Sequence, residues 1–425
     1  MTTQPSLARR LSAGDAVVIG LGSMIGAGVF AVFAPAAAAA GSGLLVGLAI
    51  AAVVAFCNAT SSAQLAAVYP QSGGSYLYGR ERLGEWWGFF AGWSFVIGKT
   101  ASCAAMALVF ASYAAPAGWE RPVAVTAVLA LAAVNYVGVT RTARVARVIV
   151  VVVLVCLAVA LAAASGPGLP ALGEVGDLVG NGWLGILQSA GLLFFAFAGY
   201  ARIATMGEEV RDPARTIPRA IAISLAITVV IYGTVAVVLL GALGPHDLAT
   251  TTTPVLDAAE LGPWPWVGPV VRFGAAAAAL GALLGLIAGI GRTGLAMARN
   301  DDLPRWLAAV HPKFQTPHHA EIVIAAVVSA LVLVVDLRGA IGFSSFGVLL
   351  YYVVANTSAL TQPAGQRRYP RWVQVLGVTG CLTLVATLPV QAVAAGLVVL
   401  AAGVAYRLVV RYALRSKAAR RSRKA

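Results

Sequence analysis

Residues 20–35, GLGSMIGAGVFAVFAP, lie inside an apolar run that is long enough to form one membrane helix. Four glycines, at positions 20, 22, 26 and 28, fall close together in this stretch. Each glycine weakens a helix by about 1 kcal/mol relative to alanine. The stretch therefore predicts either a site of close helix packing or a segment where the helix unwinds.

The composition is that of a membrane protein, with 60% apolar residues, 11% charged residues and a mean hydropathy of +0.85. The cysteines lie in apolar runs without paired spacing, and the histidines lie in loops without metal-ligand spacing. We therefore expect no disulfide framework, no metal and no cofactor. The N-terminal apolar run is too long for a signal peptide, so we expect it to remain as a span.

The hydropathy pattern predicts an all-α membrane protein with twelve transmembrane helices. The expected spans are residues 15–40, 43–68, 86–113, 121–139, 146–164, 185–206, 218–242, 267–291, 320–337, 340–361, 373–389 and 391–410.

The basic residues indicate the direction of the chain in the membrane. With a cytoplasmic N-terminus, 25 of the 30 Lys and Arg residues fall in inside segments and only Arg121, Arg272 and Arg338 fall outside. This asymmetry predicts that both termini are cytoplasmic. It also explains the net charge of +14 and the basic tail without nucleic acid as a partner, because such a tail attracts anionic lipid.

A second interruption is predicted in the sixth span, where residues 195–202 read FAFAGYAR. The two weakened spans are five helices apart, so they enter the membrane from opposite faces. This is the arrangement of inverted-topology repeats whose broken helices meet at the midplane. The matched pair favours unwinding over simple packing as the purpose of the glycines.

Four stretches resemble the amino acid-polyamine-organocation (APC) superfamily: GSMIGAGVF (22–30), residues 69–93 leading into the third span, residues 194–221 through the sixth, and residues 296–321 after the eighth. The resemblance implies a LeuT-like five-plus-five inverted repeat with discontinuous first and sixth helices. The single domain, 1–425, would then comprise repeats at 15–164 and 185–361, two additional helices at 373–410 and a basic tail at 411–425.

The resemblance also implies a substrate site in the two breaks. The amides of Ala27 and Gly28 would bind a carboxylate, because a half-helix start offers free N–H groups and a positive dipole end. Carbonyls near Ser23 and Met24, and those of Phe195, Ala196 and Ala198 at the end of the other half-helix, would accept from an ammonium. The candidate residues are Ser23, Met24, Ile25, Gly26, Ala27, Gly28, Phe195, Ala196, Phe197, Ala198 and Tyr200, with Phe197 and Tyr200 expected to line the side-chain pocket.

Lys99 lies near the middle of the third span, too deep to reach the interface. A lysine that can lose its proton there is a candidate coupling group; alternatively, it is a structural lysine bonded to the carbonyls of an unwound segment. Arg202 follows the second break, and three hypotheses fit it: it contacts the substrate, it pairs with Glu209 or it forms an inner gate. Glu208 and Glu209 belong either to a gating network or to a solvated loop.

No carboxylate falls centrally in any span, which disfavours substrates with cationic side chains. We expect a secondary carrier of a small neutral amino acid in a bacterial plasma membrane, coupled to protons, with the amino acid, the proton and the lipid bilayer as its partners. An exchanger or exporter would use the same residues. An ion channel would need rings of polar lining, and an enzyme would need a catalytic pair at depth, so neither is expected.

Overall fold

Each of the twelve apolar runs is helical in the computed structural model, which describes residues 11–26, 28–69, 73–138, 143–174, 176–204 and 210–422. The described residues form no β-sheet, and a single bridge joins Leu11 to Val210. The helices of the runs are α1 (Ala13–Met24), α2 (Gly28–Ala31), α3 (Phe33–Ala40), α4 (Leu44–Val68), α6 (Glu85–Ala114), α7 (Glu120–Tyr136), α8 (Ala143–Ser165), α9 (Gly182–Phe197), α10 (Ala201–Ala204), α11 (Pro213–Thr250), α13 (Val267–Arg299), α14 (His318–Val334), α15 (Leu337–Leu360), α16 (Arg371–Thr387) and α17 (Val390–Ser422).

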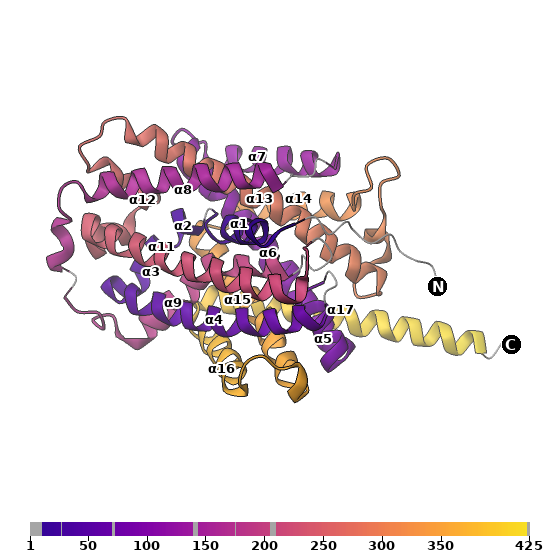
Figure 1. The fold of residues 1–425 in the computed structure, drawn as a ribbon. Coiled ribbons are helices and arrows are strands. Elements are labelled where there is room, and N and C mark those ends of the chain that lie inside the picture. The colour runs from indigo at the N-terminus through magenta and orange to yellow at the C-terminus, as the bar shows by residue number, and fades with distance from the viewer. Residues whose placement is uncertain are drawn as a thin grey trace.

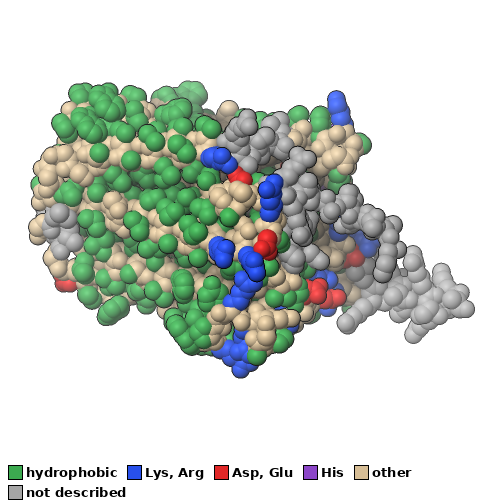
Figure 2. Space-filling view, in the orientation of Figure 1, with side chains coloured by type: hydrophobic (Ala, Val, Ile, Leu, Met, Phe, Trp, Pro, Cys, Tyr) green, Lys and Arg blue, Asp and Glu red, His purple; other side chains and the backbone are tan. Residues whose placement is uncertain are grey.

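By length and composition, the described residues contain nine helical segments that are long and apolar enough to cross a membrane. Helices α7, α14 and α16 have 17 residues each and are shorter than these. Figure 2 shows a face covered largely by hydrophobic side chains, with most of the visible charged groups gathered toward one end. The protein is therefore a multi-pass membrane protein.

Two segments expected as loops contain helices that the hydropathy pattern did not indicate. Helix α5 (Ser75–Leu83) precedes α6, and α12 (Pro254–Glu260) lies between α11 and α13. Helix α11 also continues past its expected end at residue 242, across a kink at Gly244, whose φ is 74°. Glycine tolerates this left-handed conformation, and the proline that follows it restarts a helix without needing an N–H partner.

Helix α6 lies inside the bundle, packed against α13 and α15, and Figure 1 shows it among the other helices. Helix α4 packs against α9, α11, α15 and α16, while α1 packs against α8 and α11. These contacts surround the interrupted segments that follow α1 and α9 with other helices.

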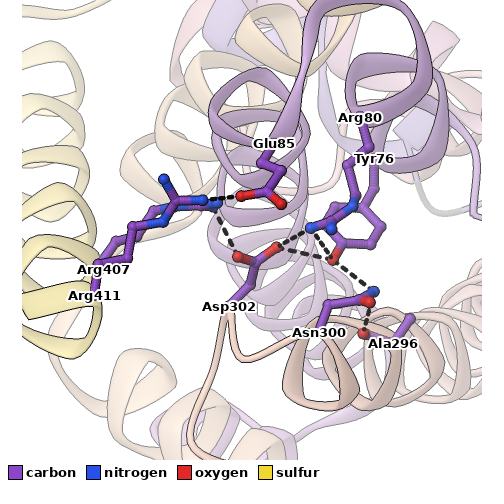
Figure 3. Close-up of polar contacts among 8 residues, drawn as sticks. All are labelled: Tyr76, Arg80, Glu85, Ala296, Asn300, Asp302, Arg407 and Arg411. Carbon is purple, nitrogen blue, oxygen red and sulfur yellow. Dashed lines mark hydrogen bonds and ion pairs between the residues drawn. The ribbon is translucent and has the colours of Figure 1, made fainter. Parts of the chain in front are cut away.

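The last helix, α17, projects from the end of the bundle where α5 lies (Figure 1). A buried ion pair joins α17 to the segment that follows α13. Arg407 Nη1 lies 2.8 Å from Asp302 Oδ1, and both side chains are almost fully buried. The other oxygen of Asp302 accepts from the Tyr76 hydroxyl at 2.9 Å and from Arg80 at 3.1 Å (Figure 3). Burial and the nearby Asp302 carboxylate raise the pKa of Tyr76 to about 12. Arg411, one turn along α17, pairs with Glu85.

Candidate functional site

The first interruption divides the expected span 15–40. The helical hydrogen bonds of α1 end where the Ile25 N–H donates to the Leu21 carbonyl at 2.7 Å, and helix resumes at Gly28 as α2. The Val32 N–H donates to the Gly28 carbonyl at 3.0 Å, so α2 leads into α3. Ile25 and Gly26 lie in the bend between them, and Ala27 lies outside the described residues.

The second interruption is a tightened turn. Helix α9 ends at Phe197, followed by the 3-10 segment η3 (Ala198–Tyr200) and then α10. The Ala198 N–H donates back to the Phe195 carbonyl, as in a 3-10 turn. The sequence predicted unpaired backbone here, whereas the structure keeps local hydrogen bonds while leaving the regular helix.

The two interruptions run antiparallel and contact each other at three levels. Gly20 of α1 packs on Ile203, the backbone of Ser23 lies against Gly199, and Gly28 lies against Ala196. A Cβ atom at position 199 would come within 2.2 Å of the Ser23 carbonyl oxygen, so only glycine allows this approach. Gly20, Gly28 and Gly199 thus allow the two breaks to meet, whereas Gly22 packs on Val150 of α8 and Gly26 packs on Ala282 of α13.

Tyr232 of α11 connects the two interruptions. Its hydroxyl lies 2.5 Å from the Met24 carbonyl oxygen and 3.1 Å from the Ala196 carbonyl oxygen, and its ring packs on Phe197 with centroids 5.0 Å apart. Sequence reasoning did not identify this residue. Its only signal was a single tyrosine within the apolar run of the seventh span.

Lys99 of α6 lies against the second interruption. Its side chain is 8% exposed, and its ammonium nitrogen lies 3.5 Å from the Ala198 carbonyl oxygen. The predicted acceptor carbonyls of Phe195, Ala196 and Ala198 therefore each have a donor within the protein. A carbonyl oxygen has two lone pairs, so each can accept a second hydrogen bond from a ligand.

The remaining predicted residues divide into those near the interruptions and those that are not described. Phe197 and Tyr200 are fully buried, and Tyr200 packs on Tyr352 of α15 with ring centroids 5.2 Å apart. Ser23 bonds back to its own helix through the Ile19 carbonyl. Arg202 lies in α10, next to the turn, whereas Glu208 and Glu209 lie outside the described residues.

Membrane-crossing helices and two interrupted helices that meet in the interior define a multi-pass membrane protein of the broken-helix type. The family model for amino acid permeases matches residues 11–411. The chain belongs to the amino acid permease family, within the APC superfamily, which confirms the resemblance seen in the sequence.

Several curated proteins are similar over most of the chain. An uncharacterized transporter of Mycobacterium tuberculosis is 58% identical over 400 residues, covering 94% of this chain and 90% of the relative. The branched-chain amino acid permease BcaP of Bacillus subtilis is 27% identical, covering 88% of this chain and 85% of the relative. Cationic amino acid transporter 4 of Homo sapiens is 28% identical, covering 84% of this chain and 60% of the relative. The family and these relatives are transporters, not enzymes.

Proposed function

We propose that the protein is a secondary carrier that moves a small neutral amino acid together with protons across the plasma membrane of a bacterium. The chain crosses the membrane twelve times in a five-plus-five inverted repeat, with residues 15–164 and 185–361 as the repeats and both termini in the cytoplasm. Helices α7, α14 and α16 are the three shorter crossings. The substrate binds between the two interruptions, and the broken helices rock against the other helices to alternate access.

The observation that carries this proposal is the antiparallel meeting of the interruptions, with Tyr232 bonded to both. The start of helix at Gly28 offers N–H groups and a positive dipole end to a carboxylate. The end of α9 at Phe197 offers carbonyls to an ammonium. A zwitterion satisfies both ends at once, which favours the backbone of an amino acid as the bound group.

The charges near the interruptions favour a neutral side chain. Lys99 and Arg202 are both cationic, and the sequence has no acid at mid-span to balance a third positive group. The buried rings of Phe197 and Tyr232 give the surroundings an apolar character. The name of the Bacillus relative agrees with an aliphatic substrate, whereas that of the human relative points to cationic ones, so the charge at Lys99 is the discriminating feature.

Proton coupling is assigned to Lys99. An ammonium buried between helices is costly in hydrocarbon, so the amine can release its proton when its surroundings change. Its contact with the Ala198 carbonyl couples that event to the turn beside the substrate. An exchanger would retain every other contact and lack this dependence on protons.

Transport in proteoliposomes tests each part of the proposal. The purified chain should be thermally stabilised by leucine, valine or alanine but not by arginine, and should catalyse counterflow of the stabilising amino acid. Replacing Lys99 with alanine should abolish uptake driven by a pH gradient. Thr100→Ala is the matched control, because the Thr100 hydroxyl donates to the Val96 carbonyl of its own helix. Counterflow without gradient-driven uptake in the unmodified protein would identify an exchanger, and counterflow of arginine would refute the neutral substrate.

A further inference from the structure

Buried polar side chains lie in a row on α4, α15 and α16, which pack against one another. The polar positions are three residues apart on α4, four apart on α15 and seven apart on α16, so on each helix they share one face. We call this row the polar seam. Its members, all 0% exposed, are Asn58, Ser61 and Gln64 on α4, Tyr352 and Asn356 on α15, Gln374 and Cys381 on α16, and Tyr200 in η3.

The middle of the polar seam is a compact hydrogen-bonded group. The Asn356 amide nitrogen donates to the Asn58 amide oxygen at 2.6 Å, and the Ser61 hydroxyl donates to the Asn356 amide oxygen at 2.7 Å. The Cys381 thiol lies 3.3 Å from the same Asn58 oxygen. Residues that are about 300 positions apart in sequence are therefore joined through polar atoms inside the membrane region.

Other atoms of the polar seam are buried without a hydrogen bond of good geometry among the described residues. They are the amide nitrogen of Asn58, the hydroxyls of Tyr200 and Tyr352, and both amide atoms of Gln374. The Tyr200 hydroxyl faces Tyr352 and Asn58. Buried polar groups in proteins are normally satisfied, and bound water satisfies those that protein atoms leave over. The unpaired Gln374 amide and the imperfectly paired Asn58, Tyr200 and Tyr352 groups therefore indicate places along the row where water binds.

The polar seam connects two defined places. At one end, Tyr200 belongs to the same turn as Ala198, whose carbonyl contacts Lys99. At the other end, the Gln64 amide oxygen lies 3.4 Å from the Arg368 backbone nitrogen, in the segment that precedes α16. The proposed orientation places that segment in the cytoplasm. The polar seam thus spans the distance from the second interruption to the membrane surface.

We propose that the polar seam binds a file of water molecules and that this file carries protons between the cytoplasm and Lys99. This inference rests on the proton coupling assigned above. A proton enters on the water beside Gln64, and each water or tyrosine hydroxyl then accepts one proton and passes one on. The Asn and Gln amides hold the waters in place. The last proton binds the Lys99 amine, giving an ammonium, and no other covalent bond changes.

The charges around the polar seam suit this role. Helices α4, α15 and α16 contain no acidic residue and no histidine, and their arginines, Arg338 and Arg371, stand at the ends of α15 and α16. The neutral groups of the polar seam therefore neither trap nor repel the proton strongly, and Lys99, which faces the Cys103 thiol on its own helix, is its proposed acceptor. If the row served only to hold α16 in place, the hydroxyl of Tyr352 would be dispensable for coupling.

The deciding variant is Tyr352→Phe, which removes the hydroxyl and keeps the ring that packs on Tyr200. In proteoliposomes, uptake driven by a pH gradient should fall about tenfold or more relative to counterflow of the same amino acid. The control is Thr357→Val on the same helix, because the Thr357 hydroxyl donates to the Val353 carbonyl of that helix. An unchanged ratio in Tyr352→Phe would overturn the relay, whereas absent counterflow in the unmodified protein would instead overturn the proposed function.

Cys381 reports on water independently of transport and of the Tyr352 variant. Chains that retain only Cys381 or only Cys156 are placed in heavy water, and loss of the S–H stretching band is followed by infrared spectroscopy. Both thiols are buried, but Cys156 lies against Gly274, away from the polar seam. Cys381 should exchange about tenfold faster or more, because it borders the water file. Equal or slower exchange at Cys381 would show that the polar seam is dry and would refute the inference.

Discussion

Replacing Gly199 with alanine tests the contact on which the candidate site depends. The added Cβ would lie 2.2 Å from the Ser23 carbonyl oxygen, 2.3 Å from the carbonyl carbon and 2.6 Å from the Met24 nitrogen. All three are backbone atoms, so no change of rotamer relieves the clash. To reach ordinary contact at 3.4 Å, the two interrupted segments must separate by about 1.2 Å.

That separation gives an expected magnitude. Overpacking of this kind costs about 1–3 kcal/mol of folding free energy. A misplacement of about 1 Å at a site that positions its ligand costs on the order of 100-fold in rate. We therefore expect Gly199→Ala to reduce counterflow about 100-fold while lowering the thermal-unfolding midpoint only moderately.

Two other glycines calibrate the result. A Cβ at Gly28 would meet Ala196 at 3.1 Å, which a small shift relieves, so Gly28→Ala should have an intermediate effect. A Cβ at Gly285 of α13 would meet nothing within 4 Å, so Gly285→Ala should transport normally and gain up to about 1 kcal/mol from helix propensity. Counterflow and melting are measured for all three variants in one preparation. If Gly199→Ala matched Gly285→Ala in both, the close approach of the two interruptions would be refuted.

The polar cluster at the base of α17 gives two further predictions. Arg407→Ala removes one partner of the buried Asp302 carboxylate and should destabilise the protein by about 3–5 kcal/mol. Arg411→Ala breaks a more exposed ion pair and should cost less than about 1 kcal/mol. Comparable thermal-unfolding midpoints for the two variants would contradict this difference. The pKa of Tyr76 is raised from 10.0 to about 12, so the folded state favours the neutral phenol. The shift adds at most about 2.7 kcal/mol to the free energy of unfolding. This contribution is present below pH 10 and is lost as the pH rises toward 12. Thermal unfolding across that range should show this loss in the unmodified protein and not in Tyr76→Phe, and a parallel loss in both would exclude Tyr76 as its source.

The two interruptions could be predicted from the sequence, because their causes are local. A helix needs a continuous run of good helix formers, and the four glycines after residue 19 disrupt that run wherever the rest of the chain lies. The predicted end of the second half-helix near Phe197 agrees with the structure. The breaks lie in the first and sixth spans, an odd separation of five, which predicted that they enter from opposite faces, and their antiparallel contact agrees with this.

The residues that join distant segments were not accessible in this way. Tyr232 stands 208 residues from Met24, and Asn356 stands 298 residues from Asn58, so nothing in either neighbourhood indicates the partner. A tyrosine or asparagine in an apolar run signals only that it must find a hydrogen bond inside the membrane.

Hydropathy thus determined which segments are helical, because it reflects how each residue interacts with the surrounding solvent. Glycine content determined where two helices break, because it acts through the residue's own backbone. Tertiary packing decided which donors reach the carbonyls at the two interruptions and that the second interruption closes into a 3-10 turn. It also decided that polar groups of three helices meet in one row. Those outcomes depend on which faces of separate helices come together, and helical periodicity orients a face without specifying its neighbour.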